Sequence, residues 1–304
     1  MDRLETLIQT LRERLPGLEL RENEPMSRHT TFRIGGPARL MALPWDRKEA
    51  ATVVRAAAEV GVKPFFLGNG SNLLVSDRGY EGLIIKSSGL DQTREVNRRL
   101  RAESGIPLAR LAVAALDRGL TGLEFAHGIP GTLGGAVVMN AGAYGGEMAQ
   151  VLTAVTYLDE TGKVTTISAA DCGLSYRHSL FSDHPEWLIL EAEMELQPGD
   201  AGTIKARMDE LSAQRRAKQP LDLPSAGSTF KRPEGHFAAA LIDQCGLKGV
   251  TVGGAQVSEK HAGFLVNRGG ATAEDMVRLI ELVRERVLRE TGVELEPEVK
   301  FLGF

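Results

Sequence analysis

Residues 128–146 read GIPGTLGGAVVMNAGAYGG, and this stretch does most to decide the fold. Seven of its 19 residues are glycine, in a chain in which 34 of 304 residues are glycine. A backbone that wraps a pyrophosphate needs N–H groups aimed at the oxygens and no Cβ in the way, so phosphate loops are rich in glycine. A second loop of this kind, GNGSN at 68–72, follows an apolar run at 64–67 that predicts a buried strand. On composition alone, the two loops fit either a ligand cradle or tight turns.

Neither loop is a standard nucleotide fingerprint. The chain has no GxxxxGK[ST] motif, which excludes the common phosphate loop of nucleotide triphosphatases. Gly68 and Gly70 lack the third glycine and the following long helix of a dinucleotide-binding Rossmann site. A nucleotide site in this chain must therefore be of another type.

The charge balance gives no sign of a nucleic-acid or membrane partner. The formal net charge is −4, so the chain lacks the basic excess that such partners require. The basic runs Arg98, Arg99 and Arg101, and Arg215, Arg216 and Lys218, are interpreted as solvated faces. No apolar stretch has the length of a membrane span, and residues 1–15 predict an amphipathic helix rather than a signal peptide.

Cysteine and histidine usage excludes two further classes. Cys172 and Cys245 lie far apart without a CxxC pattern, which argues against a disulfide framework and a thiolate metal site. The six histidines show no metal-binding spacing, and His178 with His184 is interpreted as surface chemistry. We therefore predict a cytoplasmic protein with no metal.

Hydrophobic periodicity predicts alternating helices and strands. The expected helices cover residues 46–60, 107–118 and 272–290, the last with Thr272 as N-cap and Gly292 as its stop. Strands are expected at 40–43, 64–67, 73–75, 82–86, 151–158, 163–167, 187–196 and 294–301. In the strand at 187–196, Glu191, Glu193 and Glu195 alternate with apolar residues, which predicts one wet face. The segment PGDAG at 198–202 interrupts the pattern of strands and predicts a domain boundary near residue 198.

Six blocks carry a resemblance to a known family. They are RHTTFRIGGPA (28–38), LGNGSNLLVSD (67–77), residues 128–147, SYRHSLF (175–181), PSAGSTFKRP (224–233) and LEPEVKFLG (295–303). In this order, over nearly the whole chain, they resemble the UDP-N-acetylenolpyruvoylglucosamine reductases, flavoenzymes that make UDP-N-acetylmuramate for peptidoglycan.

The resemblance implies a fold and a domain division. The fold is α+β, the FAD-binding fold of the vanillyl-alcohol oxidase and p-cresol methylhydroxylase type, with a C-terminal α/β substrate-binding domain. Two FAD-binding subdomains are expected at 1–62 and 63–197 and the substrate domain at 198–294. The strand expected at 295–304 would return to the first subdomain.

The resemblance also implies non-covalent FAD, with NADPH as co-substrate. Hydride passes from NADPH to the flavin and then to the vinyl carbon of an enolpyruvyl ether, and the adjacent carbon is protonated. The residues expected to hold FAD are Thr31, Ile34, Gly35, Gly68, Asn69, Gly70, Ser71, Asn72, Leu73, Gly128, Ile129, Gly131, Thr132, Gly134, Gly135, Asn140, Gly142 and Ala143. If these glycines serve the cofactor, a β-branched side chain at Gly70 or Gly134 should reduce FAD affinity before it affects folding.

Three residues are expected to act in catalysis. Arg177 would bind the substrate carboxylate, because a guanidinium offers fixed donors to the charge of an enolate-like intermediate. Ser228 would donate the proton, and Gly227 beside it lets the loop approach a ligand. Glu298 would polarise the intermediate or tune the acid, and alternation in the expected strand places Glu296, Glu298 and Lys300 on one face. The neighbouring Glu296 is interpreted as merely solvated.

Four further residues are expected to contact the substrate: Tyr144, Tyr176, Lys218 and Arg232. Arg232 stands where a common form of the motif has asparagine, so the resemblance leaves its contact open. The segment between Arg177 and Trp187 lacks an insertion that carries a covering tyrosine in a longer subtype, and the chain resembles the short subtype. Tyr144 is the candidate substitute.

Two alternatives stay open. One is another FAD-dependent oxidase or dehydrogenase of the same fold, acting on a small alcohol, and the other is a non-catalytic nucleotide-binding or assembly module. The sequence leaves the oligomeric state open, a monomer included.

Overall fold

The computed structural model describes residues 2–96 and 99–304, which form two compact units. The first unit comprises Met1–Glu22, Leu40–Asn69 and Gly82–Ala213, and the second comprises Asn23–Arg39, Gly70–Glu81 and Gln214–Phe304. Each unit is therefore assembled from segments far apart in the sequence. The three-part division expected from the sequence stays a prediction.

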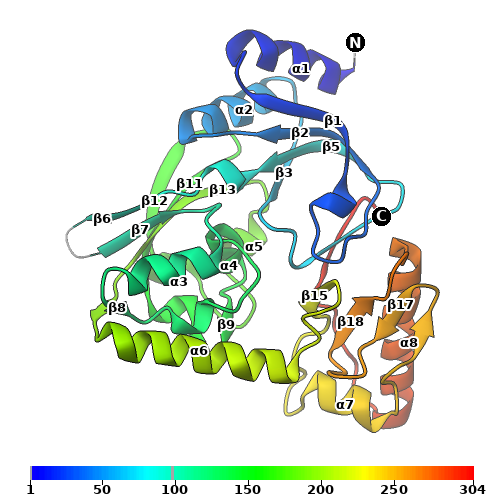
Figure 1. Ribbon diagram of the computed structural model, residues 1–304. Coiled ribbons are helices and arrows are strands. Elements are labelled where there is room, and N and C mark those ends of the chain that lie inside the picture. Colours follow the sequence, from blue (N-terminus) through cyan, green and yellow to red (C-terminus); the bar gives the residue numbers. More distant parts are fainter. Residues whose placement is uncertain (1, 97–98) are drawn as a thin grey trace. The chain divides into compact units, whose positions relative to one another are not determined.

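The first unit is built on an antiparallel sheet of strand order β12-β11-β13-β7-β6. Figure 1 shows α3 and α4 lying together beside this sheet, and their apolar side chains share one core with β7, β11 and β13. The hairpin expected from residues 151–167 is confirmed as β11 and β12. The bounds are β6 (Thr93–Val96), β7 (Arg99–Glu103), β11 (Leu152–Leu158), β12 (Val164–Ser168), β13 (Leu188–Met194), α3 (Leu108–Leu116), α4 (Leu133–Val138) and α5 (Leu180–Asp183).

The predicted wet face of β13 is wrong. Glu191 and Glu193 are only 5% and 8% exposed, because arginines from neighbouring segments cover and pair with them. Arg99 and Arg101 donate to Glu193 at 2.7 and 2.6 Å. These two arginines of the predicted solvated run are thus partners of a buried carboxylate, while Arg98 lies outside the described residues.

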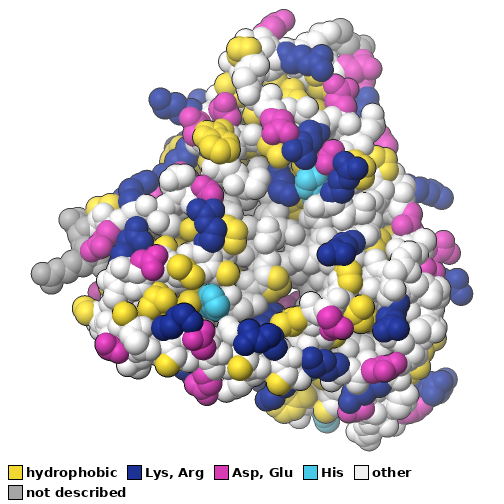
Figure 2. Space-filling model, in the orientation of Figure 1, with side chains coloured by type: hydrophobic (Ala, Val, Ile, Leu, Met, Phe, Trp, Pro, Cys, Tyr) yellow, Lys and Arg dark blue, Asp and Glu magenta, His cyan; other side chains and the backbone are white. Residues whose placement is uncertain are grey.

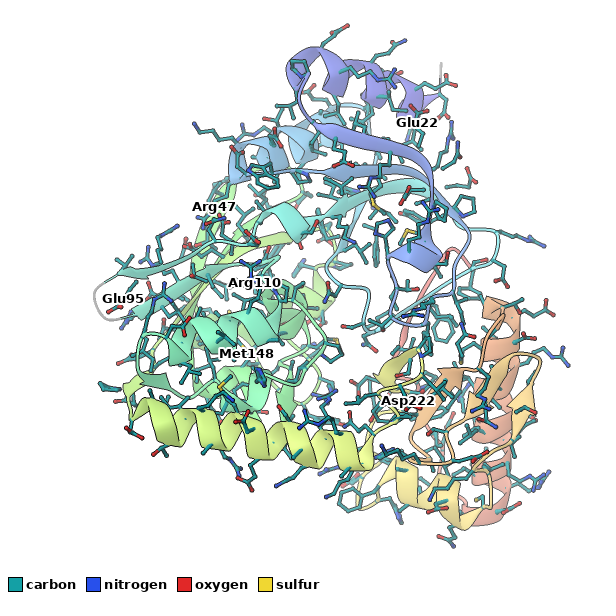
Figure 3. The ribbon with its side chains drawn as sticks, in the orientation of Figure 1. Glu22, Arg47, Glu95, Arg110, Met148 and Asp222 are labelled. Carbon is teal, nitrogen blue, oxygen red and sulfur yellow. The ribbon has the colours of Figure 1, made fainter. Side chains whose placement is uncertain are left out.

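A second cluster continues the same pattern along the sheet. Arg47, labelled in Figure 3, is the first residue of α2 (Arg47–Glu59) and donates to Glu103 at 3.0 Å and also to Glu191. Arg94 lies 2.7 Å from Glu191. Strict alternation of apolar and charged residues therefore describes the strand correctly but says nothing of what covers its charged face.

The N-terminal part confirms several predictions. Helix α1 (Arg3–Arg14) buries Leu4, Leu7 and Leu11, and α2 (Arg47–Glu59) begins at Asp46, whose side chain accepts from the N–H groups of Lys48 and Glu49. A sheet of order β1-β2-β5-β3 follows, in which β3 and β5 are parallel. The bounds are β1 (Glu19–Pro25), β2 (Pro37–Leu43), β3 (Pro64–Leu67) and β5 (Tyr80–Lys86).

The second unit contains the sheet β15-β18-β17-β16. Helices α7 and α8 pack on it around a core that includes Ile242, Leu265 and Leu279 (Figure 1). The predicted caps of α8 are confirmed, with Thr272 at the start and the left-handed Gly292 at the end. The bounds are β15 (Ser225–Ser228), α7 (Ala238–Gln244), β16 (Thr251–Val252), β17 (Ala255–Val257), β18 (Phe264–Asn267) and α8 (Ala273–Thr291).

The C-terminal strand is shorter than predicted. Only β19 (Lys300–Leu302) is a strand, paired in parallel with β4 (Leu73–Val75), and residue Pro297 makes an isolated bridge with Phe230. Within β19, Phe301 is 43% exposed and Leu302 is buried. Because Pro297 lacks an N–H group, it cannot donate to a ladder, and the strand begins only after it.

The remaining elements are short, apart from one helix. Helix α6 covers Ala201–Lys218. The short strands are β8 (Leu120–Thr121), β9 (Gly142–Ala143), β10 (Gly146–Glu147) and β14 (Gln197–Pro198). Within the described part of the chain, no helix is both long enough and apolar enough to cross a membrane. On the face shown in Figure 2, basic and acidic side chains are interspersed.

Candidate active site

The two glycine-rich stretches meet in the first unit. A Cβ added to Gly68 would lie 2.3 Å from the Oγ1 atom of Thr132, and Asn69 Nδ2 donates to the carbonyl of Pro130 at 3.0 Å. The loop that leaves β3 thus lies directly against the segment that enters α4. Residues 68–69 and 130–132, which the sequence expects to share one cofactor, are brought together by the structure.

The first backbone N–H groups of α4 already donate to carbonyl groups of the protein. The N–H of Leu133 donates to Ile106 at 3.0 Å and that of Gly134 to Ser104 at 2.8 Å. An added Cβ at Gly134 would lie 3.0 Å from the Cβ of Ser104, whereas Gly135 has nothing closer than 3.8 Å. Gly134 therefore has a packing reason to be glycine, and Gly135 is the exposed one of the pair.

Residues 142–147 form a tight hairpin. Strands β9 and β10 pair across Tyr144 and Gly145, both of which have positive φ, 54° and 85°. Tyr144 is 38% exposed at the tip. A Cβ at Gly142 would lie 2.7 Å from the carbonyl of Gly146, so this glycine is fixed by the closeness of the two strands. The structure places the candidate substrate tyrosine on a turn whose backbone leaves it accessible.

The SYRH motif is a four-residue turn closed by two backbone hydrogen bonds. Ser175 N donates to His178 at 3.1 Å, and His178 N donates to Ser175 at 3.2 Å. Arg177 has φ of 56°, and its guanidinium lies 5.4 Å from the centre of the Tyr176 ring. Tyr176 is 54% exposed. Asn140 donates to the Ser175 carbonyl at 3.1 Å, so the turn is attached to the glycine-rich stretch.

In the second unit, residues 31–36 lie against the loop that starts at Gly70. The N–H of Thr31 donates to the Gly70 carbonyl at 3.2 Å, and Gly70 has φ of 59°. A Cβ on Gly70 would lie 2.1 Å from the carbonyl oxygen of His29. The side chain of Ile34 is 2% exposed in the core, so any contact with a cofactor falls to its backbone.

The proposed acid and the proposed carboxylate share this unit and lie on adjacent backbones. The N–H of Glu298 donates to the carbonyl of Thr229 at 2.7 Å, next to Ser228. Asn72, from the glycine loop, donates through Nδ2 to the Glu298 carbonyl at 3.1 Å. Ser228 is exposed and Glu298 half-buried, and the neighbouring Glu296 pairs with Lys231 on the surface.

Lys218 and Arg232 are both exposed residues of the second unit. Lys218 is the last residue of α6. The guanidinium of Arg232 lies 4.5 Å from the ring centre of Phe237, which is 61% exposed. Sequence reasoning did not select Phe237, because a single phenylalanine in a polar loop carries no periodic signal. The one sequence signal for this cation–π pair is that Arg232 and Phe237 lie close together within KRPEGHF (231–237).

Two buried hydroxyl groups near the segments expected to bind FAD indicate whether these segments fit a polar ligand. Thr31 Oγ1 and Ser104 Oγ are buried and have no hydrogen-bond partner among the described residues. Thr31 lies in the expected FAD segment, and Ser104 lies beside Gly134. Buried hydroxyls are normally satisfied, so a polar ligand at these positions would complete both. The donor set therefore fits FAD. No group of three potential metal-binding side chains is present within residues 2–96 and 99–304.

Comparisons with known proteins agree with this layout. A family model described as "FAD binding domain" matches residues 38–168, and one described as "UDP-N-acetylenolpyruvoylglucosamine reductase, C-terminal domain" matches residues 219–302. These matches and the mixed helices and strands of the structure confirm the expected α+β class, with an FAD-binding domain and a C-terminal domain of this family. A Phl p 4 variant described as a glucose oxidase has 13% identity, a TM-score of 0.50 and coverage of 66% of this chain and 45% of its own, which shows the fold alone.

Closer relatives match nearly the whole length of the chain. The UDP-N-acetylenolpyruvoylglucosamine reductase of Caldanaerobacter subterraneus subsp. tengcongensis is 48% identical, over 98% of this chain and 99% of its own. That of Clostridium novyi is 47% identical, over 94% and 92%. The crystal structure of the Thermus caldophilus enzyme superposes with a TM-score of 0.78 at 33% identity, over 94% of this chain and 98% of its own. Because identity at this level extends over nearly all of both chains, the chain belongs to the UDP-N-acetylenolpyruvoylglucosamine reductase family.

Proposed function

We propose that this protein is an FAD-dependent oxidoreductase that uses NADPH to reduce UDP-N-acetylglucosamine enolpyruvate to UDP-N-acetylmuramate for peptidoglycan. The observation that carries the proposal is that the backbone of Glu298 bonds to Thr229, the residue after Ser228, and to the side chain of Asn72. The candidate acid, the candidate carboxylate residue and the loop expected to hold the flavin therefore lie on neighbouring backbones of one unit. We further propose that the enzyme works in the cytoplasm and takes a UDP-sugar, with no nucleic-acid or membrane partner.

FAD would be held by residues within the stretches 31–36, 68–73, 128–135 and 142–143. When bound, it supplies the redox chemistry, accepting hydride from NADPH and giving hydride to the vinyl carbon. Thr31 and Ser104 bring the buried hydroxyls that such a ligand would satisfy. The rest of the chemistry belongs to side chains of this chain.

Those side chains would bind the negative charge of the substrate and donate the proton that completes the reaction. Arg177 would hold the substrate carboxylate, whose negative charge grows as the neighbouring carbon becomes a carbanion. Ser228 Oγ would give its proton to that carbon, since a neutral hydroxyl carries a proton at every physiological pH and a carbanion is a strong enough base to take it. Glu298 would orient or polarise this step. Lys218, Arg232, Tyr144 and Tyr176 would contact the rest of the UDP-sugar.

Two half-reactions test the proposal without a steady-state assay. The purified protein should be yellow, NADPH should bleach its visible flavin band under anaerobic conditions, and UDP-N-acetylglucosamine enolpyruvate should then restore it. Bleaching by a small alcohol without NADPH, with no reoxidation by the enolpyruvyl substrate, would favour an alcohol oxidase of the same fold. A colourless protein that gains no flavin band when FAD is added would favour a binding module.

A further inference from the structure

The helix α4 ends in an unusual way. Asn140 has φ of 40°, its N–H donates to Val137 at 3.2 Å, and the N–H of Ala141 donates to Ala136 at 2.8 Å. This is the left-handed helix ending that glycine most often provides, because glycine has no Cβ to strain. An asparagine there needs a reason beyond the backbone.

The Asn140 side chain supplies that reason. It is 2% exposed, and its Nδ2 donates to the Ser175 carbonyl at 3.1 Å while its Oδ1 accepts from the N–H of Ala149 at 2.9 Å. Ala149 follows Met148, labelled in Figure 3, in the segment after the glycine-rich hairpin. One partner is a pure acceptor and the other a pure donor, so only an amide in this orientation satisfies both.

The other end of the turn is attached to the same helix terminus. Ser179 Oγ donates to the carbonyl of Val138 at 2.8 Å, and Ser182 Oγ donates to it at 2.7 Å. Ser179 is fully buried. The turn that carries Arg177 is therefore held on both sides, at Ser179 by Val138, the last residue of α4, and at Ser175 by Asn140, two residues beyond it.

Arg177 needs such support. Its φ of 56° is a conformation that a long side chain adopts at an energetic cost, so the surroundings must impose it. A guanidinium binds a carboxylate well only when its donors are placed in advance, and a small displacement is enough to weaken a bidentate contact.

We propose that Asn140 and Ser179 are positioning residues that fix the Arg177 turn on the end of α4 for substrate binding. This rests on the proposed role of Arg177 as the ligand of the substrate carboxylate. It gives Asn140 a role different from the FAD contact expected from the sequence. Helix α4 then links the two functions, with the expected flavin loop at its start and the arginine turn at its end.

Asn140→Asp tests the hydrogen bond from the Asn140 side chain to the Ser175 carbonyl. The aspartate keeps an oxygen for the Ala149 N–H, but its second oxygen replaces the Nδ2 donor and faces the Ser175 carbonyl, which is another acceptor. We expect FAD affinity and flavin reduction by NADPH to stay within about twofold of wild type, because the Asn140 side chain bonds to Ser175 and Ala149 and is buried. Reoxidation by the enolpyruvyl substrate should slow by about tenfold or more, since a hydrogen bond is lost and two acceptors face each other. Ser179→Ala should act in the same direction.

A double-mutant cycle separates positioning from other roles. In an Arg177→Lys background, which keeps a charge but loses the guanidinium fork, Asn140→Asp should slow reoxidation by less than twofold further. A full additive loss, or a large loss of FAD affinity in Asn140→Asp alone, would overturn the proposal. If instead Arg177→Lys itself leaves substrate binding and reoxidation unchanged, the proposed function of Arg177 fails, and the positioning role fails with it.

Ser168→Ala serves as the matched control. Ser168 caps a short turn of the same unit, accepting from the Asp171 N–H at 3.3 Å and donating to its carboxylate at 2.6 Å. These side-chain hydrogen bonds go to Asp171 and not to Asn140 or Ser175, so the loss of the hydroxyl should leave both half-reactions unchanged. Thermal midpoints of all the FAD-bound variants show whether any loss of rate reflects unfolding instead.

Discussion

Ser228 is the residue on which the proposed chemistry depends most. Ser228→Ala removes the proposed proton donor but no backbone bond of β15, so the fold should be kept. We expect flavin reduction by NADPH to be unchanged and reoxidation by the enolpyruvyl substrate to slow by about 100-fold or more, measured by anaerobic stopped flow. Near-wild-type reoxidation would mean that another group supplies the proton.

Gly70 shows why a glycine must be judged in the structure. The sequence suggests that replacing it harms FAD binding first, but an added Cβ would overlap the His29 carbonyl at 2.1 Å. Gly145 has a similar positive φ with nothing within 4 Å, so it isolates the cost of the backbone conformation. We expect Gly145→Ala to lose about 1–2 kcal/mol in urea unfolding and Gly70→Ala at least about 3 kcal/mol.

Equal stability losses for the two alanine variants would contradict this expectation. If Gly70→Ala then lost FAD affinity alone, the glycine would serve the cofactor after all, as the sequence analysis predicts.

Among the elements, β13 is the strand whose charges matter for stability. Burial by itself works to raise the pKa of Glu193, but hydrogen bonds from Arg99, Arg101 and Thr153 outweigh it and lower that pKa below its ordinary value. A carboxylate with a lowered folded pKa stabilises the fold above its unfolded pKa. That contribution is lost as the pH falls through the folded pKa.

Glu193→Gln removes this contribution. We expect it to cost about 1–3 kcal/mol at pH 7, because charged hydrogen bonds are replaced by neutral ones. The difference from wild type should shrink as the pH falls from 6 to 3, followed by urea unfolding at each pH. A difference that stays constant over this range would show that the charge of Glu193 contributes nothing. Glu195→Gln is the control. Glu195 is exposed, and its ion pair with Arg99 is longer, at 3.6 Å, so its charge should contribute little to stability.

At the scale of the whole molecule, the expected FAD residues come from segments far apart in the sequence, at 31–35, 68–73 and 128–143. A ligand that binds only the folded state stabilises it by about 2.7 kcal/mol when present at 100 times its Kd. We therefore expect removal of FAD to lower the thermal midpoint by several degrees, measured by calorimetry, and re-addition to restore it. A midpoint that is the same with and without FAD would contradict this expectation.

The sequence by itself determined much of this protein. Helix caps such as Asp46, Thr272 and Gly292, and the periodicity of α1, α2 and α8, are local properties that neighbouring residues decide. The motif blocks, read against a known family, also indicated the flavin loops and the candidate Ser228 and Glu298.

Only the tertiary structure decided the partners that lie far apart in the sequence. Glu193 reads as a solvent-facing residue until arginines 92 and 94 positions away are seen to cover it. Asp77 reads as a loop residue, yet its carboxylate accepts from the N–H groups of Ala273 and Glu274 at the start of α8. Asn140 likewise gains its role from Ser175. Periodicity reports which face of an element is apolar, whereas the identity of a long-range partner depends on how the chain folds back on itself.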